Sequence, residues 1–429
     1  MTTDLLRTYE SPSPAFDEAL GALRHRGVAD LARVEPEVRA ILEGVRRGGD
    51  EAVLGYGERF DGRRASPLVL RPYDGEGALG RLDRRLADAL REAAERIRVF
   101  HERQREPGFR YESGGVALGQ RVRPVARAGV YAPGGKARYP SSVLMAAIPA
   151  RVAGVAEIIV ATPGPDDLVL AACHLAGVSA VVDAGGAQAV GALAYGTESV
   201  PRVDKIVGPG NLYVTCAKRL VLGHVSIDGL AGPSEIVVVA DHTADPALVA
   251  ADLLSQAEHD EEAYPLLVTS EPGLPARVAA ELARQLAALP REPIARASLL
   301  AHGAAFVVPS RERLIAVASE LAVEHVALHV DGADEAFEQM GPMGAAFVGH
   351  ATPEAAGDYV AGPSHVLPTG GAVRFGSPLG VYDFVTRASY VRYSPEALRA
   401  QAETITALAR AEGLEAHARA VELRVGRGG

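Results

Sequence analysis

Residues 236–269 read IVVVADHTADPALVAADLLSQAEHDEEAYPLLVT. The opening apolar run is mostly β-branched, a helical pattern follows at 246–259, and a second apolar run lies at 265–269. Asp245 and Pro246 supply the N-cap and the first-turn proline that begin such a helix. Because both strands are apolar throughout rather than alternating, we expect both of their faces to be covered, as in a parallel sheet.

The same alternation of strand and helix runs through most of the chain. Short apolar runs predict further strands at 125–131, 157–161, 180–183, 205–207, 305–308 and 345–348. Alanine-rich helical patterns lie between them at 142–153, 168–177, 188–195, 212–222 and 276–289. We therefore expect an α/β fold with two open, mostly parallel, Rossmann-like sheets packed side by side, with helical appendages at both ends.

Both ends of the chain have helical spacing. The first hundred residues show a break at Gly48-Gly49, and two helical stretches within 395–425 are separated at Glu412-Gly413. Terminal arms of this kind often dock on a partner subunit. The domains that we expect are an N-terminal helical arm (1–25), a main α/β domain (26–125 with 235–385), an inserted α/β domain (126–234) and a C-terminal helical arm (386–429).

The composition narrows the class of protein. The 429 residues carry 44 Lys and Arg against 54 Asp and Glu, and the net charge of −10 argues against a nucleic-acid binder with a general basic field. Two cysteines exclude a disulfide scaffold and a cysteine-rich zinc module. The first residues do not form a secretory leader, and no apolar run reaches the roughly 18 residues of a membrane helix, so we expect a cytoplasmic protein.

Four common motifs are absent: GxGxxG after a predicted strand, GxxxxGK[ST], GxSxG and HExxH. Their absence argues against the usual dinucleotide fingerprint, a P-loop ATPase, an α/β-hydrolase and a zincin. Any function must therefore depend on less common groups of residues.

Polar groups lie along the helix predicted at 246–259. Asp252, Gln256 and His259 are spaced by four and then three residues, so they share one face of that helix. Polar side chains on a mostly buried helix need a partner. Either this face is exposed to solvent, or Gln256 and His259 bind a metal ion from one side.

Three other segments place ionisable groups in unusual surroundings. Glu324 and His325 are adjacent within an apolar, strand-like run, where burial is costly unless the groups are used or paired. Asp358 and His365 lie in a segment rich in Gly and Pro, which we expect to be a loop of the kind that often carries sites. An acid and a histidine also lie near the C-terminal helical break, Glu412 and His417. Each of these residues alone is more typical of a structural or solvent-exposed position.

Three glycine-containing loops follow predicted strands, at 131–135, 185–188 and 208–211. Glycine allows the backbone to approach a ligand closely, and a helix N-terminus offers free N–H groups to an anion. Loops at the carboxyl ends of parallel strands mark the crevice in which open α/β sheets bind ligands. Tyr131, Gln188 and Asn211 would add a stacking ring and two amides, which suit a nucleotide, although ordinary tight turns also contain glycine.

Taken together, these segments resemble histidinol dehydrogenases. The matching strings run in family order over about residues 120–420, and jointly they are highly specific. They are YAPGG (131–135), GGAQA (185–189), YGTESV (195–200), VDKIVGPGN (203–211), AGPSE (231–235), DLLSQAEH (252–259), EH (324–325), GDY (357–359), HVLPT (365–369), VYDF (381–384) and EGLEAH (412–417).

The resemblance implies a zinc- and NAD-dependent enzyme of histidine biosynthesis. Such enzymes oxidise L-histidinol to L-histidine through L-histidinaldehyde with two NAD⁺ and one Zn²⁺ per subunit. They are homodimers with intertwined ends, and residues of both chains form each active site. The resemblance places the zinc and substrate site in the main domain and the NAD contacts in the inserted domain.

The family's motifs carry residue roles onto this sequence. Zinc ligands are implied at Gln256, His259, Asp358 and His417. NAD contacts are implied at Tyr131, Gln188 and Asn211. Substrate contacts are implied at the four metal ligands and at Ser234, His325, His365 and Glu412. Glu324 and His325 are implied as the acid/base pair, in which His325 takes the alcohol proton and Glu324 activates the water that hydrates the aldehyde.

Three rival interpretations remain at this point. A paralogue of the same fold that oxidises another primary alcohol, such as a sulfonated diol, would keep zinc and NAD; Glu412, His417 and the string at 381–384 favour histidinol. A zinc hydrolase with Glu324 as its base would turn over without NAD, and it leaves the three glycine loops unexplained. A non-catalytic metal-binding or scaffold protein has no need of the full set of ligands and acid/base residues.

Overall fold

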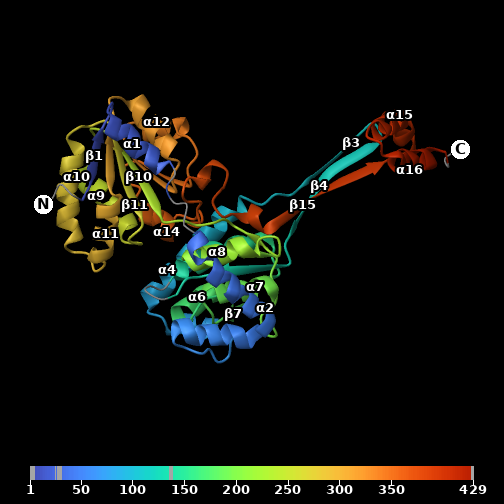
Figure 1. Cartoon of the computed structure of the whole chain (residues 1–429), viewed down its shortest axis with the longest axis horizontal. Helices are drawn as coiled ribbons and strands as arrows, with labels where there is room; N and C mark the ends of the chain where they lie inside the picture. Colours follow the sequence, from blue (N-terminus) through green and yellow to red (C-terminus); the bar gives the residue numbers. More distant parts are fainter. Residues whose placement is uncertain (1–4, 25, 27–30, 135–138, 427–429) are drawn as a thin grey trace. The chain divides into compact units, whose positions relative to one another are not determined.

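The computed structural model describes residues 5–24, 26, 31–134 and 139–426. The chain divides into two compact units. The first, here called the body, contains residues 1–104 and 126–384, and the second, here called the arm, contains residues 105–125 and 385–429. The predicted α/β fold is confirmed in the body, which holds two mostly parallel sheets covered by helices (Figure 1).

The first sheet of the body is parallel throughout, with the strand order β1-β12-β11-β10-β13-β14. Its strands are β1 (Arg7–Glu10), β10 (Glu235–Ala240), β11 (Tyr264–Thr269), β12 (Ala304–Val307), β13 (His325–His329) and β14 (Ala345–Val348). From β10 the chain passes to β11 and β12 on one side and then returns to β13 on the other. The register sets Ile236 of β10 opposite His325 of β13, so the second residue of β10 lies beside the first residue of β13.

Helices cover both faces of this sheet, as the apolar strands predicted. They are α1 (Pro14–Leu23), α9 (Pro246–Ala257), α10 (Leu274–Leu286), α11 (Glu292–His302), α12 (Arg311–Leu321), α13 (Ala333–Gln339) and α14 (Glu354–Tyr359). Alternate residues of β10 enter two separate cores: Val238 packs with Leu253 on one face, and Val239 packs with Phe306 on the other. Asp245 caps α9 by accepting a hydrogen bond from the backbone N–H of Ala247 at 2.8 Å, as its sequence position predicted.

The second sheet of the body has the order β2-β7-β6-β5-β8-β9 and is parallel except for β2, which is antiparallel to β7. Its strands are β2 (Val69–Leu70), β5 (Arg127–Tyr131), β6 (Glu157–Ala161), β7 (Ala180–Val182), β8 (Lys205–Val207) and β9 (Ser226–Ile227). The helices that follow these strands are α5 (Pro140–Ala153), α6 (Asp167–Leu175), α7 (Gly186–Tyr195) and α8 (Leu212–Val221). The strand order reverses between β5 and β8, and such a switch point opens a ligand-binding crevice at the carboxyl ends of the strands.

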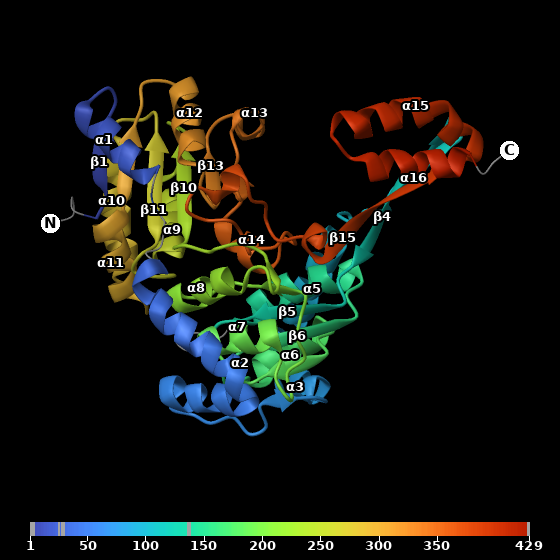
Figure 2. The same cartoon turned by 45° about the vertical axis from the view of Figure 1, so that its right-hand side comes forward.

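The helices of residues 31–102 pack on this second sheet. They are α2 (Leu31–Asp61), α3 (Gly75–Arg81) and α4 (Arg84–Glu102), and Figure 2 shows α2 beside α7 and α8. Val38 and Leu42 of α2 share a core with Val190 of α7. The predicted break at Gly48-Gly49 is confirmed, since Gly49 has φ +53° and ψ −138° inside α2.

These contacts differ from the expected domain limits. Residues 7–10 form a strand that pairs with β12, and Phe16 of α1 packs edge-on against Phe306, so the described residues before 25 belong to the first sheet rather than to a helical arm. Residues 31–102 join the second sheet rather than the main domain. An amphipathic helix shows in its sequence that one face is buried, but not which sheet buries it.

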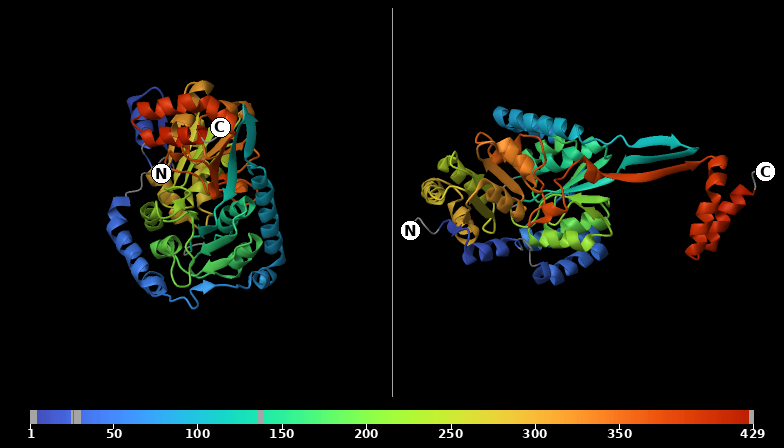
Figure 3. Two further views of the ribbon diagram at one scale, coloured as in Figure 1. Left: turned by 90° about the vertical axis from the view of Figure 1, so that its right-hand side faces the viewer. Right: turned by 90° about the horizontal axis from the view of Figure 1, so that it is seen from above.

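The arm, described by itself, is an antiparallel sheet followed by two helices. The sheet has the order β15-β4-β3, from β3 (Phe109–Ser113), β4 (Val116–Pro124) and β15 (Val385–Tyr393). The helices are α15 (Pro395–Ala411) and α16 (Glu415–Val425), which lie against each other as a hairpin (Figure 3). The helical C-terminal stretches were predicted, whereas the strands were not.

Among the described residues, no helix is long and apolar enough to cross a membrane.

Candidate active site

Two acidic residues join the beginnings of β10 and β13. The backbone N–H of Glu235 donates to Glu324 Oε2 at 3.0 Å, and the backbone N–H of Glu324 donates to Glu235 Oε2 at 3.4 Å. Each carboxylate therefore accepts a hydrogen bond from the backbone N–H of the other residue. This pair of hydrogen bonds holds Glu324 at the amino ends of the central strands of the first sheet, and both side chains are buried there.

A buried arginine neutralises Glu235. Arg26 donates from Nε and Nη2 to the two Glu235 oxygens at 3.0 and 2.8 Å, and Gly370 N–H donates to Oε1 at 2.7 Å. A bidentate pair of this kind gives directional as well as charge complementarity. The sequence analysis included Glu235 in the family string at 231–235 but gave it no role. No local pattern in the sequence marked Arg26 as part of the site.

His325 directly follows Glu324 and faces into the site with one nitrogen. Its Nδ1 lies 3.1 Å from the Glu235 carbonyl oxygen, so Nδ1–H donates and Nε2 keeps its lone pair. Burial lowers the pKa of His325 to about 4 and raises the pKa of Glu324 well above its usual value. The imidazole is therefore neutral near pH 7, as a proton acceptor must be.

Only part of the polar face predicted at 246–259 lies on a helix, because α9 ends at Ala257. Gln256 lies in the last turn and is fully buried, whereas His259 lies beyond the helix end, and Gln256 Nε2 is 3.3 Å from His259 Nδ1. Gln256 Oε1 is buried and has no hydrogen-bond partner among the described residues. Asp252 has a hydrogen-bond partner outside this group, because its Oδ2 lies 2.7 Å from His329 Nε2.

Asp358 lies on a short helix, so the loop expected for residues 357–359 is wrong. Pro353 and Glu354 begin α14, and six residues are too few to show helical periodicity in the sequence. Asp358 Oδ2 is 3.9 Å from His259 Nε2, and Asp358 Oδ1 is 3.6 Å from His365 Nδ1. Burial alone would raise the pKa of Asp358, but the surrounding histidines hold it below its usual value.

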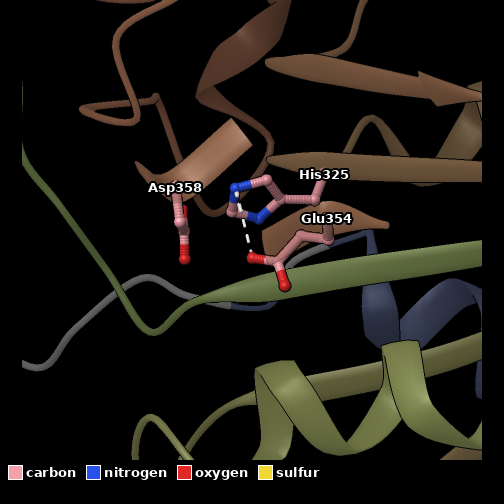
Figure 4. A group of neighbouring side chains, drawn as sticks. All are labelled: His325, Glu354 and Asp358. Atoms are coloured by element: carbon pink, nitrogen blue, oxygen red, sulfur yellow. Dashed lines mark ion pairs between the residues drawn. The ribbon is translucent and has the colours of Figure 1, made fainter. Parts of the chain in front are cut away.

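Glu354 also faces this group, and the sequence analysis missed it. Figure 4 shows Glu354 and Asp358 on either side of the His325 ring; one potential ligand atom from each of the three residues lies within 4.8 Å of the others. Glu354 Oε1 is 3.9 Å from His325 Nε2, and Oε2 is 2.7 Å from Ser255 Oγ. Burial raises the pKa of Glu354 to about 8. Its position four residues before Asp358, on the same helix face, was the available sequence signal.

The three glycine loops lie at the carboxyl ends of strands of the second sheet. Tyr131 is buried, and its hydroxyl accepts a hydrogen bond from Gly186 N–H at 3.1 Å. Gln188 is also buried. Asn211 caps α8 by accepting from the N–H groups of Tyr213 and Val214, both at 3.1 Å. Gly135, the last residue of the first loop, lies outside the described residues.

Comparison with known proteins identifies the family. The family model for histidinol dehydrogenase matches residues 24–425. The chain belongs to the histidinol dehydrogenase family. It is 50% identical over 428 residues to the histidinol dehydrogenase of Syntrophotalea carbinolica, covering 98% of this chain and 99% of that protein. It is 48% identical over 428 residues to the histidinol dehydrogenase of Pseudomonas aeruginosa, covering 98% and 97% of the two chains.

Solved structures agree with this family. A crystal structure of histidinol dehydrogenase from Elizabethkingia anophelis superposes with a TM-score of 0.92 at 34% identity, covering 99% of this chain and 98% of that one. An acetylating aldehyde dehydrogenase from Geobacillus thermoglucosidasius matches with a TM-score of 0.51 at 13% identity, over 89% and 97% of the chains, which shows a shared fold alone. The predicted family is confirmed, and the chain is an oxidoreductase.

The donors gathered in the body fit the zinc of a histidinol dehydrogenase. Gln256, His259 and Asp358 follow one another in space: the Gln256 amide contacts one nitrogen of His259, and Asp358 Oδ2 lies 3.9 Å from the other. Gln256 Oε1 has no hydrogen-bond partner among the described residues. Nitrogen and oxygen donors of this kind suit Zn²⁺. Ser234 is half-buried immediately before β10, and His365 Nδ1 is 3.1 Å from the Asp358 carbonyl oxygen.

The remaining predicted ligands of a histidinol dehydrogenase belong to the arm. Glu412 is the C-cap of α15, and His417 lies in the first turn of α16. Both side chains are exposed in the arm. Their roles toward zinc and substrate stay predictions.

A cavity lies at one end of the second sheet of this histidinol dehydrogenase. It measures about 380 Å³ and lies at the carboxyl ends of β5 and β6. The described residues that line it are Asp61, Arg63, Pro133, Gly134, Thr162, Pro163, Gly164 and Val169. Its size falls in the lower part of the range of about 300–1,000 Å³ for small-molecule sites.

The neighbouring loop at 208–211 also suits close approach of a ligand. Gly208 has φ +113°, and a Cβ there would lie 2.1 Å from the Tyr131 carbonyl oxygen, so only glycine fits. Lys218 Nζ donates to the Gly208 carbonyl at 2.9 Å, and Asp228 accepts from Gly208 N–H at 2.7 Å. These two hydrogen bonds hold both backbone polar groups of Gly208 at the switch point.

Proposed function

We propose that this chain oxidises L-histidinol to L-histidine in two NAD⁺-dependent steps, through L-histidinaldehyde, with zinc positioning the substrate. One observation carries the proposal. The neutral His325 has its free Nε2 3.9 Å from Glu354 Oε1, and a potential ligand atom of Asp358 lies within 4.8 Å of those of His325 and Glu354. Asp358 Oδ2 is in turn 3.9 Å from His259 Nε2. A base therefore lies next to a set of donors that fits zinc.

The residues of the chain have distinct roles in this proposal. When bound, Zn²⁺ would hold the amine and imidazole nitrogens of the substrate, through Gln256, His259, Asp358 and His417, and NAD⁺ would accept hydride in each step. His325 Nε2 takes the proton of the alcohol, and its Nδ1–H bond to Glu235 keeps the ring oriented. Glu324 has a raised pKa and accepts the proton of the water that hydrates the aldehyde.

Substrate is held by Ser234, His365 and Glu412 together with the metal ligands. His365 lies beside Asp358, so it reaches the same substrate atoms as that carboxylate. NAD⁺ is contacted from the second sheet, at Tyr131, Gln188 and Asn211. Because two of these side chains are buried, we assign Tyr131 and Gln188 the task of shaping the loops, and the nucleotide meets mainly backbone there.

We also propose that the arm of one chain completes the site of a second copy. The arm has little interior of its own: Phe109, Val391, Leu408 and Leu423 are exposed large apolar residues in it. Apolar surface of this kind marks an interaction site. In such a homodimer Glu412 and His417 are supplied by the partner chain.

The test counts NADH. Protein treated with a chelator and reloaded with Zn²⁺ is given limiting L-histidinol and excess NAD⁺, and NADH formed per histidinol consumed is measured. The proposal expects two NADH per histidinol, with activity lost on chelation and restored by Zn²⁺. A ratio of one, or equal activity with and without metal, would contradict the two-step or the zinc part respectively.

A panel of other primary alcohols tests substrate choice. The proposal expects L-histidinol to be preferred, because the zinc held by the predicted ligands would bind a nitrogen of its imidazole ring. Preference for an alcohol without an imidazole would indicate a paralogue with another substrate. Product formed without NAD⁺ would indicate a hydrolase.

A further inference from the structure

We propose that the cavity between β5, β6 and the end of α2 takes the adenosine end of NAD⁺, and that Asp61 makes the chain selective for NAD⁺ over NADP⁺. This inference rests on the proposed function, because it deepens the nucleotide site described there. It assigns a specificity-determining role to a residue outside every motif that indicated NAD.

The position of the cavity indicates which end of the nucleotide it holds. The strand order reverses between β5 and β8, and the chain continues from β9 through residues 228–234 into β10 of the first sheet. Lys205 of β8 also pairs with Asp383 at 3.2 Å. The β8 side therefore leads toward the sheet that carries His325, whereas the cavity lies on the β6 side of the switch point.

A dinucleotide laid across these strands has its two ends on opposite sides of β5. Neighbouring strands are about 4.8 Å apart, so the step from β8 to β6 spans roughly 10 Å. The nicotinamide must reach the alcohol carbon near His325, which places it on the β8 side. The adenosine then lies on the β6 side, where the cavity is.

Among the described residues that line the cavity, the charged ones are Asp61 and Arg63. Arg63 pairs with Asp183: Nη1 donates to Oδ2 at 2.7 Å, and Nη2 donates to Oδ1. Asp183 Oδ1 also accepts from Gly164 N–H at 2.7 Å. Asp183 therefore offsets the charge of the guanidinium and holds Arg63 at the end of β7.

Asp61 is left as the available acceptor. Within the described residues, no hydrogen bond or side-chain ion pair engages its carboxylate, and burial raises its pKa despite the nearby Arg63 charge. The two hydroxyls of an adenosine ribose can donate to a carboxylate, whereas the 2′-phosphate of NADP⁺ would be repelled by it. The same division between an acidic residue for NAD and an arginine for NADP is general in dinucleotide sites.

The test compares Asp61→Asn and Asp61→Ser with the wild type in the full-length, zinc-loaded protein. NADH and NADPH binding are measured by the fluorescence of the reduced nicotinamide, and the chain has no tryptophan to interfere. kcat/KM with L-histidinol is measured for NAD⁺ and NADP⁺. Glu58→Gln is the matched control, since Glu58 is an exposed acid of the same helix, 3.6 Å from Arg64.

We expect both Asp61 variants to bind NADH roughly ten- to a hundredfold more weakly, as for loss of hydrogen bonds to a charged group. The ratio of NAD⁺ to NADP⁺ efficiency should fall by a similar factor, and the control should retain the wild-type ratio. Wild-type nucleotide affinities and an unchanged ratio in both variants would overturn the inference.

The outcome also separates this inference from the proposed function. A wild-type chain that reduces neither nucleotide with L-histidinol contradicts the proposed function itself. A wild-type chain that forms two NADH per histidinol, together with an unchanged ratio in the Asp61 variants, contradicts only the role of Asp61.

Discussion

Replacing Arg26 with Met should destabilise the body strongly, because it leaves a buried carboxylate unpaired. The two side chains are 2% and 0% exposed, and the guanidinium makes both of its hydrogen bonds to Glu235 at 3.0 Å or less. Methionine keeps much of the apolar stem but removes the charge. Breaking one partner of a buried ion pair costs about 3–5 kcal/mol, and we expect this loss in the free energy of unfolding.

The assay is urea unfolding of wild type and variants, followed by far-UV circular dichroism at one protein concentration. Arg24→Met is the matched control. Arg24 lies two residues away and pairs with Glu320 on the surface, where its side chain is 48% exposed. Exposed pairs contribute at most about 1 kcal/mol, so the control should unfold close to the wild type.

A double variant distinguishes charge from packing. Arg26→Met combined with Glu235→Gln removes both charges and should recover a large part of the stability lost in the single variant. Equal loss in the single and double variants would mean that Arg26 acts by packing alone. A loss of less than about 1 kcal/mol in Arg26→Met would refute the reasoning, because a buried carboxylate cannot lose its counter-ion at so small a cost.

Three further predictions concern histidines. His325→Asn should lower kcat by about 10²–10⁴-fold with unchanged zinc content by metal analysis, and full activity would remove its role as base. His259→Ala should lower zinc affinity in a chelator competition, whereas the exposed His242→Ala should not; equal affinities would exclude His259 from the ligand set. Burial lowers the folded-state pKa of His101, so the unfolded state takes up its proton first, and this contribution to stability is lost as pH falls below about 6.5. Between pH 7.5 and 5, the free energy of unfolding of His101→Gln should therefore fall less steeply with pH than that of the wild type. The two slopes should differ by at most about 1.4 kcal/mol per pH unit, and equal slopes for the two proteins would contradict this.

Local sequence predicted the elements whose signal lies within a few neighbouring residues. The strand at 236–240 and the helix that follows it were predicted because apolar runs, N-caps and prolines act over one turn or one strand. The antiparallel strands of the arm were missed because their residues are mostly exposed and polar, so no apolar run marks them. The short edge strand at 7–10 is stabilised by β12, which lies about 300 residues away in the chain.

The sequence by itself determined the α/β class, the family and the candidate residues, because these follow from periodicity and from strings of side chains. Only the tertiary structure decided which of those residues meet. Glu235, Glu324 and Arg26 come together because parallel strands β10 and β13 begin side by side. Glu354 faces His325 because α14 packs against their end of the sheet. Contacts between residues tens to hundreds of positions apart depend on strand order and helix packing, and no local pattern in the chain records them.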